Sequence, residues 1–189
     1  MLFFFLASFL NNGLSWTIEP TNKEQNKPRL NLVFCPLHYS DRDDSSKDIG
    51  VILERLKKAR PFDEFTDVIN AWQVQMPLDE GEKNFKKAQG FPPLKVRQDF
   101  LDGIKNKLKS EYKLIIIDAQ GSVSCAELSS RDKLSLVILG RARYANAQSF
   151  SKGFLHELGH SLGLRDECID CGKLCPPGPP NCATTKEEA

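Results

Sequence analysis

The hydrophobic and polar positions along the chain predict strands that alternate with amphipathic helices. Residues 29–37, "RLNLVFCPL", and 112–119, "YKLIIIDA", are apolar runs of the kind that occupies buried strands. Residues 132–140, "DKLSLVILG", predict another strand, which "RARYAN" (141–146) extends as an edge. Residues 72–77, "WQVQMP", predict a short strand with alternating apolar positions.

Three segments carry apolar residues at the spacing of a helix: residues 47–60, 94–110 and 149–162. Their apolar faces consist of Ile49, Ile52, Leu53 and Leu56; Val96, Phe100, Ile104 and Leu108; and Phe150, Phe154, Leu155, Leu158 and Leu162. The candidate N-cap residues are Ser45 or Ser46 for the first helix and Ser149 or Ser151 for the third. Strands and helices in alternation predict an α/β fold, a twisted mixed β-sheet with backing helices.

Polar segments separate and precede these elements. Residues 79–93, in which charged residues mix with Gly and Pro, predict an exposed loop, and residues 61–72 predict a short helix. Residues 1–15 resemble the core of a secretory signal peptide because they hold a nine-residue run that is mostly apolar. Residues 16–28 predict a polar linker. We therefore expect a signal-like segment, a linker and one domain, residues 29–189.

The composition is that of a soluble globular protein with one domain. Of the 189 residues, 40% are hydrophobic and 27% are charged, and the formal net charge is +1. A charge so close to zero gives no basis for nucleic-acid binding or electrostatic attachment to a membrane. No segment reaches the ~18–20 apolar residues of a membrane-spanning helix, which leaves the N-terminal segment as a signal or anchor. We expect a secreted monomer, or a cytoplasmic one if that segment is not a signal.

The stretch "GFLHELGHSLGLRDEC", residues 153–168, has the residues of a zinc site. His156 and His160 are four apart on a predicted helix, so both imidazoles project from one side and can meet one metal ion. Glu157 is rotated by about 100° from His156, where it can take a proton from a metal-activated water without ligating the metal. Taken alone, the five-residue HExxH pattern also occurs as ordinary solvated helix residues.

A catalytic zinc ion needs a third protein ligand, and two carboxylates follow the histidines. Gly163, three residues after His160, suits the left-handed turn that ends a helix and sends the chain back towards the metal. We expect this turn to bring Asp166 to the metal, with Glu167 as the alternative ligand. The remaining histidine, His38, lies far upstream and would join only if its loop folded over the metal.

Four cysteines follow the motif at the spacing C-x2-C-x3-C-x6-C: Cys168, Cys171, Cys175 and Cys182. They would either hold a second, structural Zn2+ or form disulfides that stiffen a proline-rich loop, residues 168–182. A thiolate zinc site suits a reducing compartment, and disulfides suit an exported protein. The sequence leaves both interpretations open.

The residues "HELGHSLGLRDE" resemble the metzincin pattern HExxHxxGxxH, with aspartate in the last position. They are most similar to the HExGHxxxGLxDE stretch of the IgA-peptidase-like metallopeptidase family, and a softer similarity extends over residues 29–167. The resemblance implies a metzincin-like fold, in which an active-site helix carries two ligands and a substrate cleft lies below an edge strand. It implies peptide-bond hydrolysis with His156, His160 and Asp166 as zinc ligands and Glu157 as general base.

The same resemblance implies that an extended substrate pairs with the strand around residues 134–139 or with residues 141–146. The chain departs from the family pattern in having one residue fewer between the second histidine and the Asp-Glu pair. No methionine follows the motif, and Cys175 stands about where the usual methionine turn would fall. Thr184 and Glu187 start a capping box whose helix does not develop, so we expect a domain truncated at its C-terminus.

The sequence therefore predicts a zinc-dependent endopeptidase that acts on a peptide or protein substrate with one catalytic Zn2+. The alternative hypothesis is a non-catalytic or degenerate zinc-stabilised binding module, or a fragment of a larger peptidase. Tyr39 and Tyr144 are candidates to stabilise the oxyanion of the reaction, although a packing role is the commoner one for tyrosine.

Overall fold

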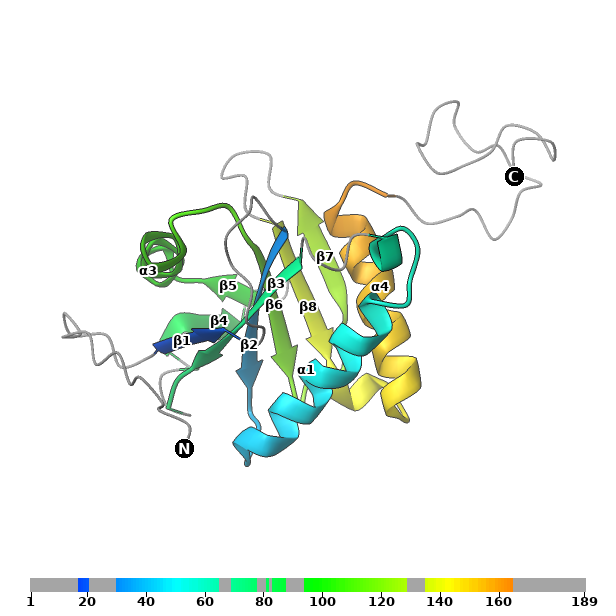
Figure 1. Cartoon of the computed structure of the whole chain (residues 1–189). Helices are drawn as coiled ribbons and strands as arrows, with labels where there is room; N and C mark the ends of the chain where they lie inside the picture. Colours follow the sequence, from blue (N-terminus) through cyan, green and yellow to red (C-terminus); the bar gives the residue numbers. More distant parts are fainter. Residues whose placement is uncertain are drawn as a thin grey trace, which may run out of the picture.

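The computed structural model of this chain describes residues 17–20, 30–64, 69–77, 81, 83–87, 94–128 and 135–164. The strands are β1 (Thr17–Pro20), β2 (Leu30–Leu37), β3 (Ile69–Gln75), β4 (Phe85–Lys87), β5 (Leu94–Val96), β6 (Lys113–Asp118), β7 (Cys125–Leu128) and β8 (Ser135–Gly140). Three longer α-helices accompany them: α1 (Arg42–Leu56), α3 (Gln98–Leu108) and α4 (Ala147–Ser161) (Figure 1).

Six of the strands form one mixed sheet in the order β1-β3-β2-β6-β8-β7 (Figure 1). The inner strands β3, β2, β6 and β8 are parallel, and the outer strands β1 and β7 run antiparallel to their neighbours. Strands β4 and β5 form a separate antiparallel pair. The prediction of an α/β fold with a mixed sheet and backing helices is confirmed. None of the described helices is long and apolar enough to cross a membrane.

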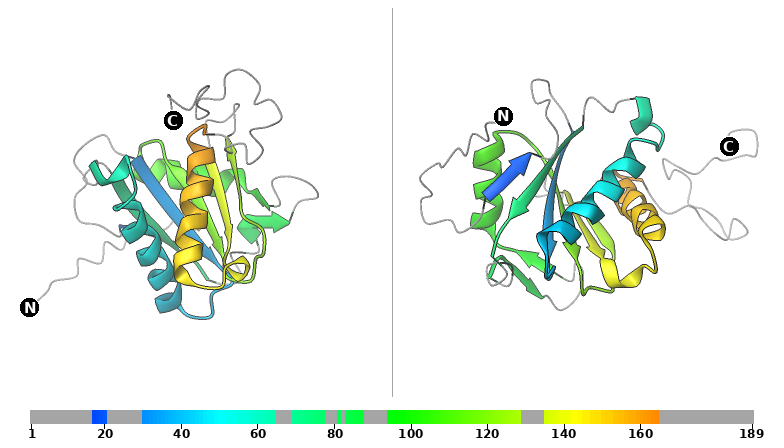
Figure 2. Two further views of the ribbon diagram at one scale, coloured as in Figure 1. Left: turned by 90° about the vertical axis from the view of Figure 1, so that its right-hand side faces the viewer. Right: turned by 60° about the horizontal axis from the view of Figure 1, so that its bottom comes forward.

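Helices cover both faces of the inner strands. In β2, Leu32 and Phe34 pack on the side of α1 and α4, whereas Val33 and Cys35 pack on the side of α3. Figure 2 shows α1 and α4 side by side on one face of the sheet. Because both faces of β2 and β6 are buried, their sequences are continuous apolar runs rather than alternating ones. This is why the sequence alone predicts these strands correctly.

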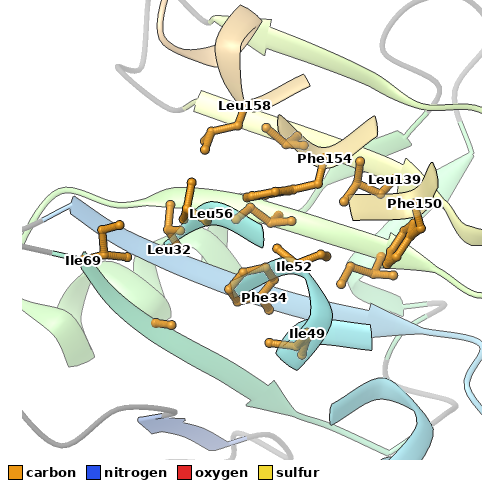
Figure 3. Packing of buried hydrophobic residues seen from close by; sticks show 14 residues of the cluster. Leu32, Phe34, Ile49, Ile52, Leu56, Ile69, Leu139, Phe150, Phe154 and Leu158 are labelled. Carbon is orange, nitrogen blue, oxygen red and sulfur yellow. The ribbon is translucent and has the colours of Figure 1, made fainter. Parts of the chain in front are cut away.

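The layer between the sheet and the two helices α1 and α4 is a tightly buried hydrophobic cluster (Figure 3). Its helical members are Ile49, Ile52 and Leu56 from α1 and Phe150, Phe154 and Leu158 from α4. The rings of Phe34 and Phe154 lie 6.3 Å apart, and both side chains are fully buried. Each such side chain contributes about 1.5–3 kcal/mol through burial. The cluster therefore fixes α4 on the sheet and determines which residues of the helix face away from the core.

Helix α1 begins five residues earlier than the predicted start at residue 47. Asp41 caps it, because the Asp41 carboxylate accepts a hydrogen bond from the Asp43 N–H at 2.9 Å. The expected caps, Ser45 and Ser46, lie inside the helix, where the Ser45 hydroxyl donates to the Arg42 carbonyl at 2.8 Å. The helical turn that precedes the apolar face is polar, and the apolar spacing therefore does not include it.

The largest departures from the predicted elements are at the outer strands of the sheet. Residues 17–20 of the expected linker form β1, and residues 125–128, where no strand was predicted, form β7. "RARYAN" does not extend β8: it contains a 3-10 helix over Arg141–Arg143, and β8 is an inner strand between β6 and β7. A short outer strand depends on its neighbour rather than on its own periodicity. The signal-like residues 1–15 lie outside the described residues.

Two predictions for the connecting segments are also wrong in part. Residues 61–72, expected as a short helix, divide into a 3-10 helix over Phe62–Glu64 and the first half of β3. Residues 85–87 of the expected exposed loop form β4, with the Phe85 ring packed edge-on against Phe100 at 5.2 Å. Phe85 anchors β4 over α3. The sequence does not predict this tertiary contact because most neighbours of Phe85 are charged.

Candidate metal centre at the end of α4

Helix α4, which carries the HExxH residues, is capped by Asn146 rather than by Ser149 or Ser151. The Asn146 side chain accepts from the Ser149 N–H at 2.9 Å, and the Asn146 N–H donates to the Ser149 hydroxyl at 3.4 Å. This reciprocal pair is a capping box. The cap fixes the first turn, and Phe150 and Phe154 then fix the rotation of the helix about its axis.

The C-terminal end of α4 is a Schellman motif built on Gly163. Gly163 has φ = 92°, and its N–H donates to the His160 carbonyl at 2.9 Å, while the Leu164 N–H donates to the Gly159 carbonyl at 3.0 Å. The predicted left-handed turn at Gly163 is confirmed. A Cβ atom on Gly159 would come 3.4 Å from the Leu164 side chain, so Leu164 folds back onto the last turn of the helix.

Two strands hold this end of α4 against the sheet. The carbonyl of Ser161, the last helical residue, accepts from the Lys113 ammonium at 2.8 Å and from the Ser135 hydroxyl at 3.2 Å. Lys113 and Ser135 are neighbours in register at the starts of β6 and β8. Burial lowers the pKa of Lys113, and its positive charge lies at the negative end of the helix dipole. The two candidate ligands, His156 and His160, thus lie at an anchored helix end.

His156 and His160 converge as their spacing predicts. Their Nε2 atoms lie 3.1 Å apart, and their rings meet edge to face with centroids 4.5 Å apart. The His156 side chain is exposed and that of His160 is half-buried. Two imidazole nitrogens at this separation can bind one metal ion or share one proton.

The backbone after the helix sets the orientation of the His160 ring. The Nδ1 atom of His160 lies 2.9 Å from the carbonyl oxygen of Leu164. A carbonyl can only accept, so Nδ1 carries the proton and donates it to Leu164. In the neutral ring Nε2 then keeps its lone pair, which is the form that binds a metal. Sequence reasoning did not identify this contact.

Glu157 lies between the histidine side of α4 and its buried side, with 7% of its surface exposed. One turn earlier, Gly153 allows the Tyr144 ring to lie against the helix, because a Cβ there would be 2.2 Å from the tyrosine hydroxyl oxygen. The Tyr144 hydroxyl donates to Ser124 Oγ at 2.9 Å, just before β7. Tyr144 therefore joins α4 to the start of this outer strand, next to the side that carries Glu157.

The other candidate tyrosine also has a packing role. The Tyr39 hydroxyl donates to the Asp48 carboxylate at 2.7 Å, and the Arg141 guanidinium donates to the same oxygen at 2.9 Å. Burial, together with the hydrogen bond to Asp48, raises the pKa of Tyr39 well above its usual range. The structure thus gives both candidate tyrosines hydrogen-bonded partners, Asp48 for Tyr39 and Ser124 for Tyr144.

His38 is far from the other two histidines. It follows β2 at the carboxyl edge of the parallel strands, where its Nδ1 lies 2.7 Å from Asp118 Oδ1 at the end of β6. The end of α4 contacts Lys113 at the start of β6, and the length of β6 separates the two edges by roughly 16 Å. His38 is therefore not a ligand of a metal held by His156 and His160.

Asp166, Glu167 and the four cysteines between residues 168 and 182 lie outside the described residues. Within the described ranges, no group of three or more His, Cys, Asp or Glu side chains is arranged to hold a metal. Two expected ligands, His156 and His160, come together, and the turn that leads to Asp166 has the predicted form.

The remaining two cysteines, Cys35 and Cys125, are buried. They lie in one row across β2, β6, β8 and β7, through Ile116 and Ile138. Three strand spacings separate them, roughly 14 Å, which is too far for a disulfide. The two interpretations of the cysteines, disulfides or a thiolate zinc site, therefore apply to the four cysteines that follow the HExxH motif.

No model of a known protein family matches this chain, and no curated protein matches its sequence. The chemistry of the site is accordingly inferred from its own residues.

Proposed function

We propose that this chain is a zinc-dependent endopeptidase of metzincin-like type, with its metal at the end of α4. The observation that carries the proposal is the convergence of His156 and His160, whose Nε2 atoms lie 3.1 Å apart. Two nitrogens bound to one tetrahedral zinc ion at 2.0–2.1 Å would lie about 3.3 Å apart. The two side chains therefore fit the ion with little movement, and the Leu164 carbonyl favours the required tautomer of His160.

His156 and His160 would supply two ligands and Asp166 the third. Zn2+, when bound, would polarise the scissile carbonyl and make water acidic enough to give up a proton near neutral pH. Glu157 would take that proton as general base and return it to the leaving amine.

The substrate would lie along β7. The structure does not support the segments first expected for this role, since β8 has strands on both sides and residues 141–143 are helical. β7 is the outermost strand of the sheet on this side, and α4 packs against it. An extended peptide added outside β7 would pass beside the helix that carries the two histidines.

One observation favours a second candidate, a zinc-stabilised module without catalysis. Glu157 has only 7% of its surface exposed, whereas a working general base must reach the attacking water. In this alternative His156 and His160 still bind zinc, and Glu157 serves as a buried polar contact of α4.

Hydrolysis of an unfolded protein substrate by the full chain, loaded with Zn2+, tests the proposal. Glu157→Gln should reduce hydrolysis to background and retain zinc, while Glu54→Gln, an exposed position on α1, should change neither. A wild-type chain that binds one zinc ion and cleaves nothing would favour the non-catalytic module. Absence of zinc binding by the wild type would overturn both candidates.

A further inference from the structure

A cavity of about 270 Å3 lies at the edge of the sheet opposite the end of α4. It is next to the last residues of β2 and β3 and the first turn of α1. Leu37, Val74 and Met76 give it an apolar wall, and His38 and Asp41 are among its polar lining residues. None of these residues takes part in the proposed peptidase chemistry.

The cavity lies between the ends of β2 and β3, next to the point at which the direction of the chain through the sheet reverses. From β2 the chain passes through α1 to β3, and from β3 it passes over the other face through α3 to β6, on the far side of β2. Open sheets of parallel strands bind ligands in the crevice outside their carboxyl ends at such a reversal. His38 follows β2 and Asp118 ends β6, so each comes from one of the two strands beside the reversal.

His38 and Asp118 form an oriented pair. The His38 Nδ1 lies 2.7 Å from Asp118 Oδ1, and the Gln120 N–H donates to the same oxygen at 3.0 Å. In the neutral ring, a carboxylate that accepts from Nδ1 leaves Nε2 as the ring nitrogen with a lone pair. The His38 side chain is 38% exposed and lines the cavity, so a ligand can reach this second nitrogen.

The backbone around the pair is constrained. His38 has φ = 57°, a left-handed conformation that costs a non-glycine residue about 1–2 kcal/mol. A Cβ on Gly121 would come 2.9 Å from the Cβ of Asp118, so the turn after β6 closes tightly over the carboxylate. The Ala119 N–H donates to the Leu37 carbonyl at 3.0 Å and ties this turn to the end of β2. The site is therefore formed before a ligand arrives.

The charges around the cavity favour a positive ligand. Asp41 lines the cavity, and Asp118, outside the lining, binds the Nδ1 atom of the lining residue His38. The guanidinium of Arg42, which also lines the cavity, is paired with Glu19 at 2.6 Å. Among the described residues, the carboxylates thus exceed the cations that are available to a ligand.

We propose that this cavity is a binding site for a small organic cation, separate from the zinc site. The apolar part of the ligand would lie on Leu37, Val74 and Met76, and its ammonium group would donate to Nε2 of His38. The volume limits the ligand to the size of an arylalkylamine, since sites for drug-sized molecules begin at about 300 Å3.

Benzylamine is a suitable probe, with benzyl alcohol and benzoate as neutral and anionic counterparts. Titration of the 15N-labelled full chain, observed through its imidazole resonances, should show saturable shifts of the His38 nitrogens with benzylamine. Benzyl alcohol should bind about tenfold more weakly because it lacks the charge, and benzoate should give no saturable shift. Equal binding of benzylamine and benzoate, or an unshifted His38, would overturn the proposal.

Two variants separate the site from the rest of the fold. His38→Ala should weaken benzylamine binding by about tenfold or more, followed by the amide resonances of β2 and β3, and His156→Ala should leave it unchanged. Met76→Trp should exclude benzylamine by filling the apolar wall, with the His38–Asp118 pair and its resonances retained. Retention of wild-type affinity in both His38→Ala and Met76→Trp would refute the assignment. Zinc removal should not alter binding, so the result is independent of the proposed peptidase function.

Discussion

The Nδ1 nitrogen of His160 lies 2.9 Å from the carbonyl oxygen of Leu164, across the turn that ends α4. This contact links the way in which α4 ends to the protonation pattern of the His160 ring. The turn at Gly163 satisfies the last carbonyls of the helix, and the residue after it presents an acceptor that fixes the tautomer of His160. The end of the helix is thus also part of the proposed metal centre.

Replacement of Gly163 should therefore affect both stability and metal binding. Gly163→Ala forces a side chain into a backbone with φ = 92°, which should lower the free energy of unfolding by about 1 kcal/mol. A shifted Leu164 carbonyl would no longer orient His160, so zinc affinity should fall by about tenfold or more. Chemical denaturation of the metal-free chain and zinc titration against a competing chelator measure the two effects.

Gly50→Ala is the matched control for this substitution. Gly50 lies within α1 with open space around its Cβ position, so alanine should raise stability by about 0.5–1 kcal/mol and leave zinc affinity unchanged. If Gly163→Ala lost stability but kept full zinc affinity, the Leu164 carbonyl would not be a partner of the metal site.

The assignment of the third ligand predicts unequal effects at two neighbouring carboxylates. Asp166→Ala should release most of the zinc at a competing chelator concentration that the wild type withstands, because a two-histidine site holds zinc weakly. Glu167→Ala should lower zinc affinity much less. Metal content by mass spectrometry after dialysis distinguishes the two. A larger loss of zinc in Glu167→Ala than in Asp166→Ala would transfer the ligand role to Glu167. Full retention of zinc in both variants would show that neither carboxylate is a ligand.

Contact between Tyr144 and α4 makes a prediction about stability. Gly153→Ala places a Cβ 2.2 Å from the Tyr144 hydroxyl oxygen and should cost about 1–3 kcal/mol in the free energy of unfolding. Truncation of the tyrosine should relieve the clash, so Gly153→Ala should cost much less in a Tyr144→Ala background. Additive losses in a double-mutant cycle from denaturation curves would show that Tyr144 does not pack on Gly153.

The sequence predicts best what depends on contacts along one element. Continuous apolar runs identify β2, β6 and β8, the four-residue spacing places His156 and His160 together, and Gly163 marks the end of α4. These features follow from local geometry. The IgA-peptidase-like resemblance and the ligand role of Asp166 remain predictions, which the described residues neither support nor oppose.

What the sequence does not predict depends on contacts between distant segments. β1 and β7 are strands because β3 and β8 pair with them, not because of their own periodicity. His38 and Asp118 are eighty residues apart and meet through the parallel register of β2 and β6. The same holds for Lys113, a strand residue whose ammonium donates to the carbonyl of Ser161 at the end of α4.

Lys113 anchors α4, and its replacement should destabilise the last turn of that helix. Lys113→Met removes the ammonium that donates to the Ser161 carbonyl at 2.8 Å, which should cost about 1 kcal/mol near neutral pH because Ser135 still donates to that oxygen. Lys113→Arg, which retains a donor and a charge, should cost less. Amide hydrogen exchange should accelerate in the last turn of α4 in the methionine variant, while exchange in α1 stays unchanged.

The pH dependence of stability offers a second measurement on Lys113. Burial lowers its folded-state pKa below the ordinary value of 10.5, so between these two values the unfolded chain binds more protons than the folded chain. Stability attributable to Lys113 should therefore increase as pH rises through this window. The difference in unfolding free energy between the wild type and Lys113→Met, both free of metal, should grow in favour of the wild type up to pH 10.5. A difference that is constant over this range would mean that Lys113 is as well solvated in the folded chain as in the unfolded one.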